Sequence, residues 1–392
     1  MACSNSAEKI TFAENCVIAH RGAWKKNNLP QNSIASLKQA IALGTAGSEF
    51  DVRMTKDDVL IVTHDADYEG MEVEETLYSE LSKYKLPNGE TLPTLKQYLI
   101  AGMKNNSSTG LVLEIKPSKL EERNDAITEN VVKLVKELNA EGHILSYISF
   151  SYNILKRVKE LDSLAKTQYL DGSKSPERLK EDGISGLDYL IYKYKIHPEW
   201  IASAKQNELI LNAWVADKTD DIDWLLANSF DYLTTDEPEL VFERIKKSPT
   251  NEGYKLVWSD EFNYKGKPDS TKWAFEYDFK RNLEKQYYVD RLKNARVEDG
   301  LLVLETHKET IKNEAFVSKQ AKGWKENWEY AEYSAPSLST KNIAEWTYGR
   351  IEIRAQLPKG TGLWPAFWMI GANYDEVRWP ECGEIDIMEH IG

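Results

Sequence analysis

The first candidate for chemistry is a short stretch in which two carboxylates and an imidazole are spaced for a hairpin. Apolar and β-branched residues flank a turn at 56–58, which predicts a strand, a tight turn and a returning strand over residues 48–65. Glu49 and Asp51 are two residues apart, so their side chains point to the same face of a strand. The returning strand is expected to bring His64 opposite Asp51. Two neighbouring carboxylates repel each other unless a cation lies between them, and a divalent metal suits such a pair. A surface hairpin with solvated acids is the alternative.

The elements that must position these residues alternate between strands and helices. Short apolar strands are expected to end near His20 and to include Glu49, and six more follow at 111–116, 145–150, 166–170, 189–192, 209–214 and 232–235. Helical patterns separate most of them, as at 34–44, 131–138 and 154–161. Parallel strands that alternate with helices over roughly 250 residues predict a TIM-type (β/α)8 barrel.

In such barrels the chemistry lies at the carboxyl ends of the strands. Polar residues recur at or near these ends: His20, Arg21, Glu49, Asp51, His64, Glu114 and Lys116. Three carboxylates suit a hard cation such as Mg²⁺ or Ca²⁺, and Arg and Lys suit an anionic oxygen group. Two histidines suit a general acid and a general base. Together these residue types indicate metal-assisted cleavage of a phosphate ester.

Residues 17–247 resemble a glycerophosphodiester phosphodiesterase. The matching pieces keep the family's order and spacing, and they are Ala-His20-Arg21-Gly22, Glu49-Phe-Asp51-Val, His64-Asp65, Leu-Glu114-Ile-Lys116, Asn-Ala-Trp214 and Leu-Thr-Thr-Asp236-Glu-Pro. The resemblance implies hydrolysis of a glycerophosphodiester to an alcohol and glycerol phosphate. It assigns the acid and base to His20 and His64, the metal to Glu49, Asp51 and Glu114, and the phosphate clamp to Arg21 and Lys116.

Two features depart from that family's pattern. Gln31 stands where the family usually has Glu, and the segment after Asp65 is short and lacks the usual Arg-Thr-Thr run. Both bear on the choice of substrate more than on the chemistry. Trp24 and Trp214 are candidates to line the alcohol pocket, with core packing as an equal alternative. The barrel could also act on another phosphodiester, such as a phospholipid head group.

The composition narrows the partners and the compartment. The chain has 392 residues, which suggests two domains, and a net charge of −13. Because no Lys/Arg run stands out, we do not expect nucleic-acid binding, and no apolar stretch is long enough to span a membrane. Cys3, in a polar leader at 1–16, resembles the start of a bacterial lipoprotein without its signal peptide. This resemblance implies a secreted, periplasmic or cell-surface protein that meets the membrane only through a lipid on Cys3. An incidental cysteine is the alternative.

The composition and the predicted secondary structure change after a polar linker at 248–253. Four of the twelve tryptophans lie in the first 247 residues and eight lie beyond them. Short strands replace helices and are expected at 255–258, 301–305, 349–356, 366–370 and 384–388. This pattern predicts an all-β jelly-roll sandwich over residues 254–392.

The second domain carries its own row of acids. Glu384 and Asp386 share a strand face, and a one-residue bulge near 387–388 would bring Glu389 to the same face. Such a row suits a retaining glycosidase, whose two carboxyl groups lie about 5–5.5 Å apart. Flat apolar faces for sugar rings are available nearby from Trp364, Trp368 and Trp379. An exposed acidic strand without a catalytic role is the alternative.

Residues 254–392 resemble the amino-terminal half of a family 16 glycoside hydrolase of the laminarinase branch. The pieces are Leu-Val-Trp258-Ser-Asp260-Glu261-Phe262, Tyr348-Gly-Arg350-Ile-Glu352-Ile-Arg354, Gly-Leu-Trp364-Pro-Ala-Phe-Trp368-Met and Gly-Glu384-Ile-Asp386-Ile-Met-Glu389. The resemblance implies a retaining endo-β-1,3-glucanase acting on a β-glucan, with Glu384 as nucleophile, Glu389 as acid/base and Asp386 tuning the nucleophile.

Members of that family continue well past the acid motif, whereas this sequence stops at Gly392. We therefore expect an incomplete, truncated sandwich with little or no glucanase activity beside an active phosphodiesterase. Alternatively, the β-module only binds polysaccharide. The fusion also raises the hypothesis that the two activities together strip and cut a glucan that bears phosphoglycerol groups.

Overall fold

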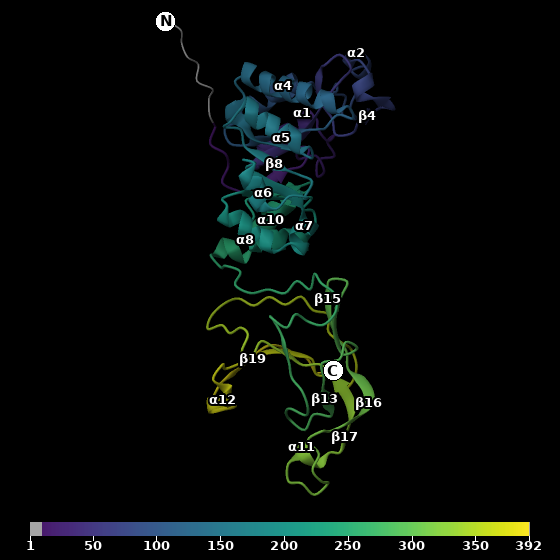
Figure 1. Cartoon of the computed structure of the whole chain (residues 1–392), viewed down its shortest axis with the longest axis vertical. Coiled ribbons are helices and arrows are strands. Elements are labelled where there is room, and N and C mark those ends of the chain that lie inside the picture. The colour runs from purple at the N-terminus through teal and green to yellow at the C-terminus, as the bar shows by residue number, and fades with distance from the viewer. Residues whose placement is uncertain (1–9, 392) are drawn as a thin grey trace. The chain divides into compact units, whose positions relative to one another are not determined.

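The computed structural model describes residues 10–391 and divides the chain into two compact units, one ending at Leu256 and one beginning at Val257 (Figure 1). Cys3 and most of the expected polar leader lie outside the described residues. Within residues 10–391, no helix is both long and apolar enough to cross a membrane.

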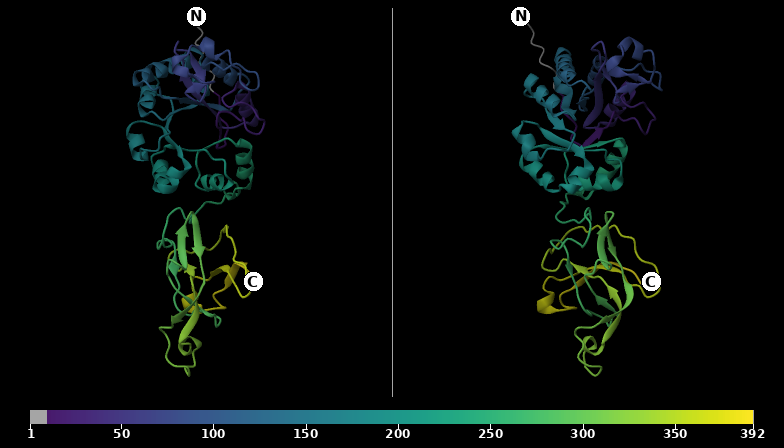
Figure 2. Two further views of the ribbon diagram at one scale, coloured as in Figure 1. Left: turned by 90° about the vertical axis from the view of Figure 1, so that its right-hand side faces the viewer. Right: turned by 45° about the vertical axis from the view of Figure 1, so that its right-hand side comes forward.

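The first unit is built on eight parallel strands that close into a ring, which Figure 2 shows in its left view as a ring surrounded by helices. The strands are β1 Val17–Ala19, β2 Gly47–Met54, β6 Gly110–Ile115, β7 Ile144–Ser149, β8 Thr167–Tyr169, β9 Gly186–Leu190, β10 Ile210–Trp214 and β11 Tyr232–Thr235. Closure comes from β1, which pairs in parallel with both β2 and β11. The predicted TIM-type barrel is confirmed.

The helices cover the outside of this ring. They are α1 Ile34–Leu43, α3 Leu95–Met103, α4 Glu121–Glu137, α5 Tyr152–Leu161, α6 Pro176–Glu181, α7 Ile191–Ile196, α8 Glu199–Gln206, α9 Thr219–Ala227 and α10 Pro238–Lys247, with 3₁₀ turns η2 Glu141–His143 and η3 Pro249–Glu252. Ser33 caps α1 by accepting a hydrogen bond from the Ser36 N–H, and Thr94 and Gln97 form a capping box on α3. The strand expected at 189–192 lies earlier, at 186–190, because that is the stretch that pairs with β10.

Strict alternation along β2 determines what faces the barrel interior. Phe50 packs outward against Tyr98 of α3, with ring centroids 4.5 Å apart. The residues on either side, Glu49 and Asp51, therefore point inward. The predicted hairpin is confirmed, since β3 Leu60–Val62 returns antiparallel beside β2. The pairing of Val52 with Val62 places Thr63, and not His64 as expected, opposite Asp51, and the Thr63 N–H donates to the Asp51 carbonyl. His64 is the next residue along the chain.

A small lobe continues from the hairpin before the chain reaches α3. It consists of β4 Asp67–Tyr68, β5 Met71–Glu72, η1 Val73–Glu75 and α2 Tyr78–Leu81. Its own apolar cluster joins Ile61, Val73, Leu81 and Leu92, all nearly inaccessible to solvent. The lobe therefore has a fixed connection to the hairpin that carries His64.

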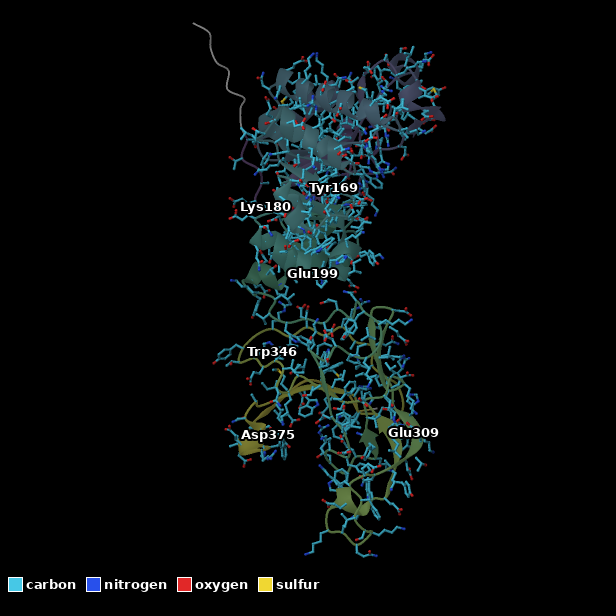
Figure 3. The ribbon with its side chains drawn as sticks, in the orientation of Figure 1. Tyr169, Lys180, Glu199, Glu309, Trp346 and Asp375 are labelled. Carbon is cyan, nitrogen blue, oxygen red and sulfur yellow. The ribbon has the colours of Figure 1, made fainter. Side chains whose placement is uncertain are left out.

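The second unit is all-β apart from two short helices. Its elements are β12 Ala274–Phe275, β13 Gln286–Tyr288, β14 Ala295–Glu298, β15 Leu301–Leu304, β16 His307–Lys312, α11 Trp324–Asn327, β17 Tyr330–Ala335, β18 Leu338–Ser339, β19 Ala366–Ile370, α12 Tyr374–Val377 and β20 Glu384–Glu389. They pair in small sheets that are mostly antiparallel, in keeping with the predicted sandwich. One of its apolar clusters is aromatic, with Phe279 in contact with Trp324 and Trp328. Trp346, labelled in Figure 3, packs edge-on against Trp258.

Two of the strands predicted for this unit are absent, so these predictions are wrong. Residues 255–258 and 349–356 belong to no strand or sheet in the described part of the chain. A strand forms only when a neighbour satisfies its backbone groups, and the apolar side chains of these stretches stay exposed, with Ile351 and Ile353 each 45% accessible.

Gly22 is expected to be essential for the fold around the first barrel loop. Its φ is +80°, and an added Cβ would lie 2.5 Å from Ser36 Oγ. Gly44 also has a left-handed backbone (φ +70°), but nothing lies near its Cβ position. Gly44→Ala should cost about 1 kcal/mol of unfolding free energy from backbone strain alone, and Gly22→Ala distinctly more. Urea unfolding of both variants measures the difference, and equal losses would contradict the clash.

Candidate active site

Three carboxylates converge inside the barrel at the carboxyl ends of β2 and β6. Asp51 and Glu114 are register partners on these neighbouring strands, and Glu49 lies two residues before Asp51 on the same face. Glu49 is 2%, Asp51 1% and Glu114 5% exposed. One oxygen atom from each lies within 4.8 Å of the others. Negative charges this close and this buried need compensation.

Part of that compensation comes from three neighbouring groups. The Lys116 ammonium lies 2.8 Å from Asp51 Oδ1 and 2.7 Å from Glu114 Oε1. Asn32 donates from Nδ2 to Asp51 Oδ2, and its Oδ1 accepts from the Asp51 backbone N–H. The Arg21 backbone N–H donates to Glu49 Oε2 at 2.8 Å. Lys116, expected in the phosphate clamp, therefore also neutralises two of the expected metal ligands.

The pKa values of the three acids diverge because their compensation is unequal. Burial, followed by repulsion from Asp51 and Glu114, raises the pKa of Glu49 well above its usual value. Burial and the charge of Asp51 raise the pKa of Glu114 to about 7. Burial alone would raise the pKa of Asp51, but the charges of Lys116 and His64 lower it to about 2. Without a further cation, the cluster therefore resists holding three full negative charges near pH 7.

A divalent cation fits this cluster. Glu49 Oε1 is buried and has no hydrogen-bond partner among residues 10–391, and all the donor atoms are hard carboxylate oxygens. Such oxygens are the ligands that Mg²⁺ and Ca²⁺ prefer. A bound dication would supply the charge that Lys116 alone cannot, which would allow all three acids to ionise.

His20 is held by a carboxylate from the opposite end of the domain sequence. Its Nδ1 lies 2.8 Å from Asp236 Oδ1, and its Nε2 faces the acid cluster at 4.0 Å from Glu49 Oε2. Asp236 also accepts a hydrogen bond from Trp24 Nε1 at 3.1 Å. Burial would raise the pKa of Asp236, but the hydrogen bond from His20 lowers it. An ionised Asp236 therefore fixes the imidazole with Nε2 directed at the site.

His64, like His20, is paired with a carboxylate through its Nδ1. Its Nδ1 lies 2.7 Å from Asp65 Oδ1, and its backbone carbonyl accepts a hydrogen bond from Arg53 Nε at 2.8 Å. Burial lowers the pKa of His64. This imidazole is thus mainly neutral near pH 7 and is able to accept a proton.

Arg21 has its backbone in the left-handed region, with φ of 54°. Its Nη1 donates to Gln31 Oε1 at 2.7 Å, and its Nε lies 3.5 Å from Asp51 Oδ2. Gln31, at the position that departs from the family pattern, therefore orients the guanidinium without cancelling its charge. The guanidinium keeps a positive charge for an anionic substrate.

The two tryptophans expected near the alcohol pocket differ in placement. Trp24 is tied to Asp236 through its indole N–H and so supports His20. Trp214 ends β10 at the mouth of the barrel, where its ring meets Phe150 edge-on at 5.7 Å. Sequence reasoning assigned no role to Asp236 or Arg53. Asp236 lies in a motif that resembles the family, whereas Arg53 gave no signal beyond its position beside Asp51.

In the second unit, the predicted bulge is present. Trp368 pairs with Asp386 and Phe367 with Met388, so Ile387 is the extra residue in β20. Glu384, Asp386 and Glu389 consequently pair with alternate residues of β19 and share one face. All three are exposed.

The expected sugar-binding tryptophans surround this row unevenly. Trp364 donates from Nε1 to Glu389 Oε1 at 3.0 Å and is 60% exposed. Trp368 lies 37% exposed on the face of the acids, with the Arg281 guanidinium 5.3 Å from its ring centroid. Trp379 is 62% exposed, and no described contact brings it to the acids. The structure thus joins two of the three tryptophans to the acidic face.

Comparison with known proteins identifies the first unit. The model of the glycerophosphoryl diester phosphodiesterase family matches residues 20–240, more than half of the chain. The chain belongs to this family. The phosphodiesterase unit is 30% identical over 246 residues to a glycerophosphodiester phosphodiesterase of Caldanaerobacter subterraneus, covering 98% of that protein and 59% of this chain. The crystal structure of a glycerophosphodiester phosphodiesterase from Parabacteroides distasonis matches with a TM-score of 0.58 and 37% identity, over 60% of this chain and 98% of that one.

The second unit matches the model described as an XgeA-like, catalytic GH16 domain over residues 306–392. A β-glucanase of Rhodothermus marinus is 43% identical over 155 residues, which is 38% of this chain and 47% of that protein. The chain thus spans about half the length of the curated glucanase relative that it matches. The resemblances to both families are confirmed, and both are families of hydrolases.

Asp236→Asn is expected to lower kcat on a glycerophosphodiester by roughly 100-fold, within the range of a positioned acid–base group. The neutral amide lacks the charge that stabilises a protonated His20, and its NH2 group can also donate to an unprotonated Nδ1, so the tautomer is no longer fixed. Asp65→Asn makes the matched change at His64, but Asp65 is 78% exposed, so its loss should be smaller. Steady-state kinetics on both variants measures the ratio. A kcat unchanged in Asp236→Asn would contradict the role of this carboxylate.

Proposed function

We propose that the barrel is a metal-dependent glycerophosphodiesterase that releases an alcohol and glycerol phosphate. The observation that carries the proposal is the cluster of Glu49, Asp51 and Glu114, buried between two histidines that each pair with a carboxylate. Membership of the family supports the reaction class. The resemblance supports the roles of the individual residues.

Different residues of the site would bind the metal, bind the phosphate and transfer protons. The three carboxylates would hold a Mg²⁺ or Ca²⁺ ion, which when bound would neutralise charge on the phosphoryl oxygens. Arg21 and Lys116 would hold the phosphate through its anionic oxygens. His64, whose pKa is lowered by burial, would accept a proton from the attacking water. His20, held by Asp236, would donate a proton to the leaving alcohol oxygen.

For the second unit we propose a retaining glucanase site in which Glu384 is the nucleophile, Glu389 the acid/base and Asp386 a tuning residue, with a β-1,3-glucan as substrate. The shared face of these acids and the relatives named as glucanases support this proposal. In the polypeptide as given we propose little or no glucanase activity. The support is the exposure of all three acids, on a strand that pairs with β19 alone among the described residues.

Chelation should abolish phosphodiesterase activity, and Mg²⁺ or Ca²⁺ should restore it. Glu49→Gln should bind the ion at least tenfold more weakly by isothermal titration calorimetry and lose most of its activity, because one of three charged ligands is removed. Glu122→Gln, on the exposed surface of α4, is the matched control. Full activity after exhaustive chelation, or unchanged activity in His20→Ala, would refute the mechanism.

The polypeptide as given should hydrolyse glycerophosphodiesters but release little or no reducing sugar from laminarin. Retaining chemistry needs Glu384 and Glu389 held at a fixed separation, which an exposed two-stranded sheet holds poorly. The control is Glu384→Gln assayed under identical conditions. Laminarin cleavage that disappears in this variant would show that the described unit is competent and the expectation wrong.

A further inference from the structure

One side of the barrel mouth is apolar and open to solvent. Phe150, just after β7, is 40% exposed, and Leu190, the last residue of β9, is 43% exposed. Trp214, the last residue of β10, is partly buried beside them. All three stand at carboxyl ends of barrel strands, where this fold places its substrates. We call these three residues the apolar wall.

The contacts of the wall show that it is one surface. Leu190 and Trp214 are register partners on adjacent strands, so their side chains point to the same side of the sheet. Trp214 meets the Phe150 ring edge-on at 5.7 Å. Its indole N–H donates to the Asp188 carbonyl at 2.9 Å, so the ring is held in place and offers carbon surface to a ligand.

Further apolar residues of the barrel pack against the wall. Tyr169 of β8, labelled in Figure 3, packs outward against Tyr152 of α5 with ring centroids 4.9 Å apart. The next residue, Leu170, belongs to the interior cluster that contacts Trp214 and is 4% exposed. The wall is therefore continuous with the barrel's own core, and a ligand that covers it extends that core.

The wall begins directly beside the acid cluster. Lys116 connects the two, because its Nζ lies 2.7 Å from Glu114 Oε1 and 6.0 Å from the centroid of the Phe150 ring. A phosphate held by Lys116 would therefore have one ester arm within reach of Phe150. The histidine and arginine groups that meet the same cluster, His20 and Arg21, are polar. The two arms of a diester would thus meet unlike surroundings.

Charge decides which kind of arm suits the wall. An aromatic face attracts one cation, and Lys116 already lies over the face of Phe150. A quaternary ammonium group placed there would be repelled by that ammonium at short range. An uncharged hydrocarbon group would gain from burial of apolar surface without this penalty.

We propose that the alcohol arm of the natural diester is uncharged and apolar, and that it lies against the wall of Phe150, Leu190 and Trp214. This inference rests on the phosphodiesterase function proposed above and names the substrate class of that site. In the reaction a bond forms between the water oxygen and phosphorus, and the bond from phosphorus to the apolar alcohol oxygen breaks. The alcohol takes up one proton and glycerol phosphate keeps the phosphoryl group, so no further reactant is required.

The decisive test uses two substrates that differ in one charge. Glycerophosphocholine and the 3,3-dimethylbutyl ester of glycerol phosphate have the same shape, but the second has carbon in place of the cationic nitrogen. We expect kcat/KM to be at least about tenfold higher for the dimethylbutyl ester. In a series of linear alkyl esters, kcat/KM should rise by up to about fourfold for each methylene that becomes buried.

Substitutions in the wall test whether these residues cause the preference for the uncharged ester. Leu190→Asn should reduce the ratio of kcat/KM for the two substrates at least about fivefold, and Phe150→Ser should reduce it as well. Leu164→Asn is the matched control, because Leu164 is 89% exposed before β8, at the amino-terminal end of the barrel. Its ratio should stay within about twofold. Thermal unfolding of each variant confirms that it is folded.

The outcomes separate the two proposals. Equal or faster turnover of glycerophosphocholine by the native protein overturns the apolar arm and leaves the phosphodiesterase intact. An unchanged ratio in both wall variants, once folded, overturns the assignment to the wall. Hydrolysis of neither ester in the presence of Mg²⁺ or Ca²⁺ overturns the phosphodiesterase itself and the apolar arm with it.

Discussion

The burial of three carboxylates in one barrel interior is the constraint on which the site depends. Glu49, Asp51 and Glu114 are each almost fully removed from solvent, and a buried carboxylate is strongly disfavoured unless it is hydrogen-bonded or paired. Several neighbouring groups compensate these charges. Lys116 stands between two of the acids, and the first barrel loop turns back to direct a backbone N–H at the third. The left-handed φ of Arg21 is part of that turn.

Much of this could be predicted because it depends on alternation along single strands. Residues two apart on β2 share a face whatever the rest of the chain does, and the same holds for Glu114 and Lys116. Eight parallel strands that alternate with helices over this length are typical of a closed barrel, which places these faces inside. The bulge in β20 was predictable for a similar reason, since three acids reach one face only if a residue is skipped.

The contacts that could not be predicted are those between segments far apart in the sequence and those from a side chain to a backbone group. Asp236 reaches His20 across 216 positions because β11 closes the ring against β1. Arg53 donates to the backbone carbonyl of His64, and no residue pattern indicates such a contact. In the second unit, the stretches at 255–258 and 349–356 have suitable apolar residues but no partner strand in the described chain. The residue pattern predicts which side chains share a face of a strand. Whether the strand forms depends on a neighbouring strand that pairs with its backbone.

Lys116 shows how one residue serves chemistry and selectivity together. Burial would lower its pKa, but Asp51 and Glu114 raise it, so the ammonium stays charged at the centre of the site. The same charge lies over the ring of Phe150. The group that compensates the acids therefore also sets the polarity that an occupant of the wall can have. Because both effects arise from one ammonium, a substitution of Lys116 would change both the compensation of Asp51 and Glu114 and the alcohols that the barrel accepts.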